Sequence, residues 1–363
     1  MKLWQILAVI GFGIGYGLIE PGRFTYAFGH ATLYVFLPAL LFEAAWNLNY
    51  RAIVRQWIVI TALAGPGVLL TALVVAGALA VARVPFGPAL LAGAILSATD
   101  PIAVVAVFRR LKVPKTLATI VECESLFNDA VAVALYRGVL VVLTLGTASA
   151  GAMLIVALDT AAGAAGGLLL GIVVAFAAAR LLRESKSAEL QIAATLVGAY
   201  GVYFAADFFR LSGIFATIAF GIALRYYERS WITLRLADDV NRFWDIAALA
   251  ANVLVFFMVG AALEIGRVAH QPAFTIACLV GVAVARIVVA GFLLPGPYPR
   301  EWIDVVRIAG MRGGLSLALA LAIPPEVPYR EAIVNATFAV ALATLAASSF
   351  ALVPVVRRAA KAR

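Results

Sequence analysis

The stretch VECESLFNDAV, Val121–Val131, places acids and other polar residues inside a sequence that is otherwise hydrocarbon. A charge at bilayer depth costs about 2.5 kcal/mol or more, so acids persist there mainly where they face a cavity, a partner or an ion pathway. On a helix, residues four apart share a face, which places Ser125 beside Asp129 and Glu124 beside Asn128. This stripe of oxygen atoms predicts a site for a small, hard cation.

The segment SATDPIA, Ser97–Ala103, adds a second interruption of an apolar run. Proline has no N–H and disfavours helical geometry at the preceding residue, so Pro101 frees the Ser97 carbonyl and holds Asp100 toward an extended form. Within a membrane such freed carbonyls must face protein, water or an ion. The segment therefore predicts a helix that is broken near mid-membrane.

The composition of the whole chain predicts a polytopic membrane protein. Its 363 residues are 64% hydrophobic and 13% charged, with a mean hydropathy of +1.03, whereas soluble domains average roughly a quarter charged residues. The net charge is +9, but the basic residues lie between apolar runs and not on a soluble module. We therefore expect a single all-α transmembrane domain over residues 1–363 and no binding of nucleic acid.

The chain contains about twelve apolar runs long enough to cross a bilayer as helices. They cover residues 3–19, 32–48, 57–82, 88–108, 117–145, 152–182, 188–209, 211–227, 243–263, 273–294, 303–323 and 332–356. Most of the 28 Lys and Arg residues lie at the N-terminus, in the even-numbered loops and in the C-terminal tail. Because cytoplasmic loops are enriched in these residues, both termini are predicted to be cytoplasmic.

The eleventh run repeats the peculiarity of the fourth with different residues. Gly310, Gly313 and Gly314 flank Arg312 in the middle of this run. Glycine permits departures from helical geometry, and a buried arginine needs acceptors. Runs four and eleven cross the membrane in opposite directions. This pattern predicts two inverted repeats, with broken helices 4 and 11 crossing at mid-membrane around the binding site.

The polar residues of the two motifs are candidate ligands for an ion. Oxygen ligands without histidine suit Na+ or H+ and argue against zinc and copper. We expect Asp129 to exchange a proton for a cation, the alternative being a carboxylate that only specifies packing. Na+ is expected to bind at Asp129, Ser125, Thr99 and Glu124.

The remaining charged groups of these spans are expected to support the site. We expect Glu124 to pair with Arg312, either as architecture or in support of the ion. Arg286 in the tenth run needs an acid, for which Glu122 and Asp100 are the candidates. Asp100 is expected to balance the positive end of a half-helix in span 4, and Arg312 the negative end of one in span 11.

Two glycine-rich stripes would allow close approach of neighbouring helices. The approach is either ordinary packing within the chain or contact between two copies. The glycines are Gly11, Gly13, Gly15 and Gly17 in the first run and Gly163, Gly166, Gly167 and Gly171 in the sixth.

At these motifs the chain resembles the NhaP-type sodium/proton antiporters, the branch of monovalent cation:proton antiporters that includes the eukaryotic sodium/proton exchangers. The resemblance rests on SATDPIAVVAVFRRLKVP (97–114), ESLFNDAVAVALY (124–136) and GMRGGLSLALALAIP (310–324). It extends to FLPALLFEAAWNLNY (36–50), FWDIAALAANVLVFFMVGAAL (243–263) and VARIVVAG (284–291). It thus covers nearly the whole chain.

The resemblance implies a transport core of helices 3–5 and 10–12 and a dimerising scaffold of helices 1, 2 and 6–9. It makes Asp129 the cation and proton carrier. It implies ligand or near-ligand positions at Thr99, Glu124 and Ser125, and supporting roles for Asn128, Asp100 and Arg312. Asn128 before Asp129 is the form associated with electroneutral members. Members commonly carry another helix ahead of the one starting here at Leu3, and this chain is expected to lack it.

The expected function is secondary active exchange of Na+ or Li+ for H+ by a homodimer in the plasma membrane. We expect alternating access and electroneutral 1:1 exchange, with no cofactor and no enzymatic activity. A K+/H+ antiporter of the same fold is the nearest alternative. An ion channel would not need a titrating carboxylate beside a helix break. An intramembrane aspartyl protease would need YD and GxGD patterns, and neither is present.

Overall fold

The computed structural model describes residues 3–20, 32–145, 150–183, 185, 187–231, 237–261, 271–294 and 298–361, in which the regular structure is helical. Helices satisfy their own backbone donors and acceptors, as a membrane requires. Six helices in this part of the chain are long and apolar enough to cross a membrane, judged by length and composition. The all-α prediction is confirmed, and six of the about twelve expected spans reach this standard.

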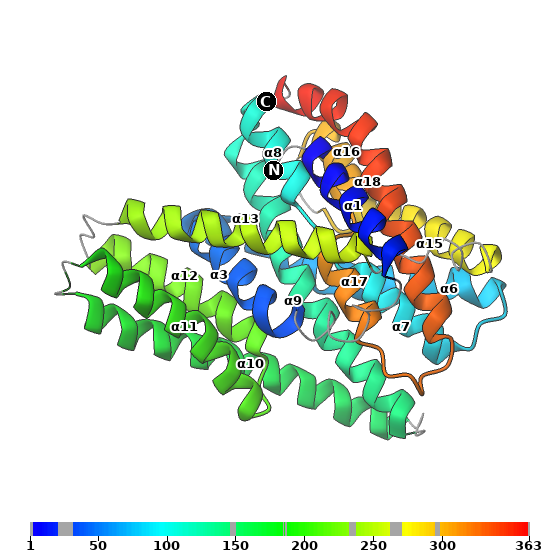
Figure 1. The fold of residues 1–363 in the computed structure, drawn as a ribbon, viewed down its shortest axis with the longest axis horizontal. Coiled ribbons are helices and arrows are strands. Elements are labelled where there is room, and N and C mark those ends of the chain that lie inside the picture. Colours follow the sequence, from blue (N-terminus) through cyan, green and yellow to red (C-terminus); the bar gives the residue numbers. More distant parts are fainter. Residues whose placement is uncertain are drawn as a thin grey trace. The chain divides into compact units, whose positions relative to one another are not determined.

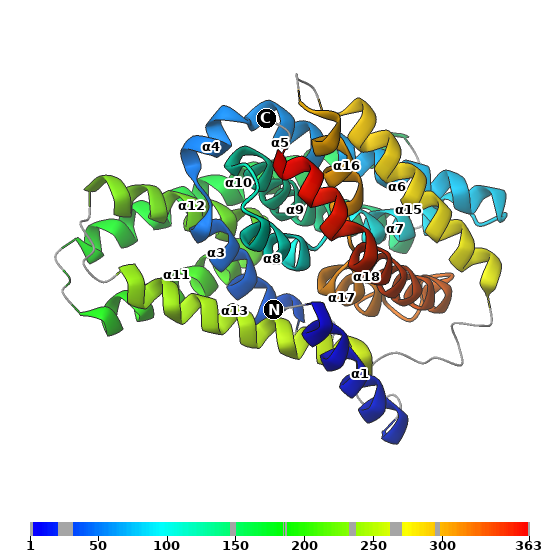
Figure 2. The ribbon, with the colours of Figure 1, turned by 90° about the horizontal axis from the view of Figure 1, so that it is seen from above.

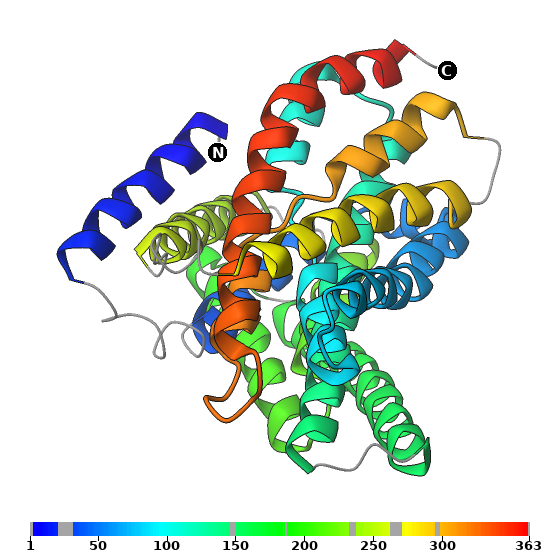
Figure 3. The same cartoon turned by 90° about the vertical axis from the view of Figure 1, so that its right-hand side faces the viewer.

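The chain divides into two compact units, and the first comprises Met1–His30, Arg51–Thr147 and Val255–Arg363. Within it α15 packs against α6, α6 against α7 and α7 against α9, while α18 runs along α16 (Figures 2 and 3). The helices assigned to this unit are α1 (Leu3–Ile19), α4 (Tyr50–Arg55), α5 (Trp57–Ala64), α6 (Pro66–Val81), α7 (Phe86–Ser97), α8 (Ile102–Leu111), α9 (Lys115–Leu145), α15 (Pro272–Phe292), α16 (Arg300–Ala309), α17 (Gly314–Leu321) and α18 (Arg330–Lys361).

The second unit comprises Ala31–Tyr50 and Ala148–Leu254. Its helices α10, α11 and α12 lie side by side, with α3 packed against α11 and α12 (Figure 1). Its elements are η1 (Thr32–Phe36), α3 (Leu37–Asn47), α10 (Ala150–Leu182), α11 (Ala188–Phe208), α12 (Gly213–Trp231) and most of α13 (Ala237–Ala261). Tryptophans anchor its core: Trp46 Nε1 donates to Asn241 Oδ1 (2.7 Å) and Trp244 Nε1 to Thr195 Oγ1 (3.0 Å).

The glycines of α10 allow close packing against other segments of the same chain. A Cβ at Gly167 would lie against the backbone of Ser212, and one at Gly171 against the backbone of Ala216. The Ser212 amide also donates to the Gly163 carbonyl at 2.9 Å. Of the two readings of this stripe, packing within the chain therefore accounts for these glycines.

The glycines of α1 divide into two pairs. Gly13 and Gly17 lie against the last turn of α13, where a Cβ on either would overlap with backbone atoms of that turn. Gly260 of α13 in turn lies against the backbone of α1. Gly11 and Gly15 have no neighbour within 4 Å of an added Cβ. Only alternate glycines are therefore needed for this helix contact.

Candidate functional site

The fourth apolar run is interrupted between α7 and α8. α7 ends at Ser97, Ala98 is extended (φ −60°, ψ 140°), and helix resumes at Ile102 after Pro101. The Ser97 hydroxyl bonds back to Ala94 O (2.7 Å), which satisfies one carbonyl of the last turn. α7 and α8 are thus separate helices on either side of Pro101, a residue that has no N–H to donate.

The eleventh run is interrupted between α16 and α17, and the two interruptions meet. Gly313 is extended (φ −123°, ψ −160°) immediately before α17. The Asp100 amide donates to Met311 O at 2.8 Å. A Cβ on Gly313 would overlap with the Asp100 carboxylate, so glycine is what allows this close approach. Asp100 therefore lies beside the start of α17. From the sequence we expected it to act only at the half-helix of span 4.

Arg312 is buried in the α16–α17 interruption and bonds to backbone carbonyls. Its Nε donates to Leu96 O (2.7 Å) in the last turn of α7, and Nη1 donates to Gly310 O at the end of α16. Both carbonyls belong to helix C-terminal ends, where a positive charge is favourable. The expected ion pair between Arg312 and Glu124 is wrong, because this side chain turns toward α7.

The basic partner of Glu124 is Arg286 of α15. Arg286 Nη1 lies 2.8 Å from Glu124 Oε1, both side chains are buried, and Nη2 donates to Val306 O of α16. A Cβ on Gly310 would overlap with this guanidinium. Glu122 and Asp100 were the expected partners of Arg286, and that expectation is wrong. The cause is the packing of α15 on α16, which carries the guanidinium across the end of α16 to Glu124.

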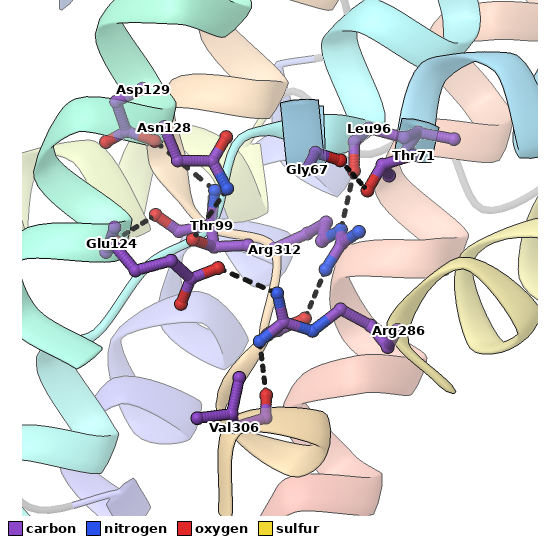
Figure 4. Close-up of polar contacts among 12 residues, drawn as sticks. Gly67, Thr71, Leu96, Thr99, Glu124, Asn128, Asp129, Arg286, Val306 and Arg312 are labelled. Atoms are coloured by element: carbon purple, nitrogen blue, oxygen red, sulfur yellow. Dashed lines mark hydrogen bonds and ion pairs between the residues drawn. The ribbon is translucent and has the colours of Figure 1, made fainter. Parts of the chain in front are cut away.

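Three residues of α9 hold Thr99 by all of its polar atoms (Figure 4). The Ser125 hydroxyl donates to Thr99 O (2.6 Å), and the Thr99 amide donates to Asp129 Oδ1 (3.3 Å). Asn128 Nδ2 lies 3.4 Å from Thr99 Oγ1. Four of the residues singled out in the sequence therefore meet at the first helix interruption.

Asp129 differs from its neighbours in exposure and pairing. It is partly exposed, whereas Glu124, Ser125 and Thr99 are buried. Among the described residues Asp129 makes no ion pair, and its hydrogen-bond donor is the Thr99 amide. It therefore remains available for a proton or a cation.

Several hydroxyl groups at the interruptions were not singled out in the sequence. Ser316 Oγ donates to Ala98 O (3.3 Å), and Ser348 Oγ donates to Ile308 O (3.2 Å). Thr344 Oγ1 accepts from the Arg312 amide (3.2 Å). Serine and threonine within apolar helices commonly bond to their own backbone, so the sequence does not distinguish these three from the rest.

The family described as "Sodium/hydrogen exchanger, transmembrane" matches residues 4–358. The low-affinity Na+/H+ antiporter NhaS1 of Synechocystis sp. is 33% identical over 86% of this chain and 61% of its own length. The Na+/H+ antiporter NhaH of Halobacillus aidingensis is 30% identical over 89% of this chain and 82% of its own length.

A solved structure shares the fold. The sodium proton antiporter MjNhaP1 of Methanocaldococcus jannaschii superposes with a TM-score of 0.83 at 20% identity, covering 97% of this chain and 91% of that one. The match with NhaS1 covers 61% of that protein, so the present chain spans less than two thirds of its length. The match over residues 4–358 nonetheless runs through both helix interruptions and α9. The chain belongs to the sodium/hydrogen exchanger family.

Proposed function

We propose that this protein is a secondary antiporter that exchanges Na+ or Li+ for H+ at Asp129. The observation that carries the proposal is the contrast between two neighbouring acids: Glu124 is buried and paired with Arg286, whereas Asp129 is partly exposed and unpaired. The partner of Glu124 already balances a negative charge, whereas the carboxylate of Asp129 has no such partner among the described residues and is proposed to bind a proton or a cation in turn. The names of the relatives, all Na+/H+ antiporters, support the same exchange.

The cation is proposed to bind to oxygen atoms around Asp129. Ser125 and Thr99 supply hydroxyl and carbonyl oxygens beside this carboxylate, which are ligands that a hard ion prefers. Glu124 stays in the proposed ligand set through its carboxylate, although one of its oxygens is bonded to Arg286. Asp100, Asn128 and Arg312 support the interruptions.

Transport is proposed to proceed by alternating access in a plasma-membrane homodimer. We infer a core of spans 3–5 and 10–12 built as inverted repeats, with the two interrupted helices crossing at mid-membrane, and a scaffold of spans 1, 2 and 6–9. Both termini are proposed to be cytoplasmic. The bond between Asp100 N and Met311 O supports the crossing, because it joins the two interruptions directly.

The function is tested by reconstituting the purified protein in liposomes that contain a pH-sensitive dye. Addition of Na+ or Li+ is expected to drive proton movement, while protein-free liposomes stay silent. A response to K+ alone would assign the protein as a K+/H+ antiporter, the other candidate of the same fold. Ion currents without coupled proton movement would indicate a channel, and no response to any of the three ions would contradict the proposal.

Exchange is expected to be electroneutral, with one Na+ for one H+. Asn128 is an amide and takes up no proton in the physiological range. Glu124 already has a partner, because its Oε1 lies 2.8 Å from Arg286 Nη1. Asp129 alone then alternates between one proton and one Na+, so the two charge movements cancel.

The stoichiometry is checked by clamping the membrane potential with K+ and valinomycin. The exchange rate should be the same at zero and at about 100 mV, although one net charge would gain about 2.3 kcal/mol over that range. Protein treated identically but with the K+ gradient removed is the control. Acceleration by an inside-negative potential would mean that a second proton is carried.

A further inference from the structure

A series of hydrogen bonds begins at the candidate ion site. The Ser125 hydroxyl donates to Thr99 O at 2.6 Å. That carbonyl and the amide of Asp100 belong to one peptide group, and this amide donates to Met311 O at 2.8 Å. The series has thereby crossed from α9, through the first helix interruption, to the second.

The series continues through a second peptide group to α18. Met311 O and the Arg312 amide belong to one peptide group, and this amide donates to Thr344 Oγ1 at 3.2 Å. The Thr344 hydroxyl donates in turn to Ala341 O at 3.1 Å, within its own helix. Figure 3 shows α18, in orange to red, running beside the α16–α17 segment that contains this peptide.

Every donor in the series points the same way, from Ser125 toward α18. Each peptide group is conjugated, so an acceptor bonded to its N–H makes its C=O a better acceptor. In a low-dielectric interior such bonds strengthen one another by roughly 10 to 30% each. The Thr344 hydroxyl at the end of the series thus influences the strength of the hydrogen bond that the Ser125 hydroxyl donates at its start.

The direction of the series matters for the ion. A serine hydroxyl has one proton to donate and two lone pairs. Because the Ser125 proton is committed to Thr99 O, its lone pairs remain available to a cation. Withdrawal of that proton into the series also makes the hydroxyl oxygen more negative, which strengthens it as a ligand.

We propose that Thr344 is a positioning residue of the ion site, which fixes and polarises the Ser125 hydroxyl across both helix interruptions. The inference rests on the proposed exchange function. Thr344 belongs to α18, which contributes no proposed ligand. A residue outside the ligand set would thus help to determine the affinity for Na+. Thr344 acts only through the peptide groups at Arg312 and Asp100.

The same helix supplies a matched control. Ser348 lies one turn from Thr344 and also bonds to the α16–α17 region, through Ile308 O at 3.2 Å. Its bond lies on the α16 side and outside the series. Loss of either hydroxyl should loosen the interruption, but only loss of Thr344 should change the ion site.

The test compares Thr344→Val, Thr344→Ser and Ser348→Ala in proteoliposomes, with the apparent KM for Na+ and the melting temperature as readouts. Valine keeps the shape of threonine without the hydroxyl, whereas serine keeps the hydroxyl. Thr344→Val is expected to raise KM roughly three- to tenfold, the effect of one lost hydrogen bond. Thr344→Ser should keep a KM close to wild type, and Ser348→Ala should lower the melting temperature with KM unchanged.

Each outcome separates the inference from the function on which it rests. A wild-type protein without proton exchange driven by Na+ or Li+ would remove the proposed function. Active wild-type protein together with equal KM values for the valine and serine variants would overturn the role of Thr344. An equal rise of KM in Ser348→Ala would also overturn it, because the effect would then be general loosening. Thr344→Ala gives the same comparison where the valine variant is not recovered.

Discussion

Asp129→Asn is expected to abolish exchange while leaving a folded protein in the membrane. An amide nearly matches the carboxylate in size and can still accept from the Thr99 amide, so the local backbone should be retained. It takes up no proton in the physiological range and carries no charge to balance a cation. Both halves of the proposed cycle are therefore lost. The measurement is Na+-driven proton movement in proteoliposomes at equal protein content.

A control removes a carboxylate that lies outside the site. Asp304 of α16 forms a half-exposed pair with Arg307 at 3.0 Å, and pairs that are open to solvent contribute little to stability. Asp304→Asn should therefore keep near wild-type exchange. Robust exchange by a well-folded Asp129→Asn variant would contradict Asp129 as the carrier and would direct attention to Asp100.

Arg286→Met is expected to give the largest loss of stability. Both partners of the Glu124–Arg286 pair are buried, at 2% and 7% relative exposure. Removal of one partner of such a pair leaves an uncompensated charge and typically costs about 3 to 5 kcal/mol. The melting temperature in detergent should fall accordingly. The double variant Glu124→Gln/Arg286→Met should be more stable than the single one, because no charge is left unpaired.

Arg307→Met provides the matched control for this second experiment. It removes an arginine from the exposed pair with Asp304, and the expected change in stability is about 1 kcal/mol or less. An Arg286→Met variant as stable as Arg307→Met would mean that the Glu124 pair is not important for stability. A double variant no better than the single one would mean that Glu124 is not left as an unpaired charge.

Features that depend on neighbouring residues along the chain could be predicted from the sequence. The motif around Pro101 predicts a helix boundary, and α7 ends at Ser97 while α8 begins at Ile102. Helical spacing also places Ser125, Asn128 and Asp129 on one face of α9, whereas their contacts with Thr99 come from the tertiary structure. The hydrophobic composition likewise indicates a helical membrane protein, because a bilayer leaves few other ways to satisfy the backbone.

Only the tertiary structure decided which groups meet between helices. Both Arg286 and Arg312 are buried arginines in apolar spans, and the sequence favoured the wrong one as the partner of Glu124. The choice depends on the rotation and packing of α15 and α16, which local spacing does not define. The contacts of the Thr344 hydroxyl on α18 and of the α10 glycines likewise depend on which helices pack against them. Helical periodicity determines the face on which a side chain lies, whereas its partner depends on which helix the fold packs against that face.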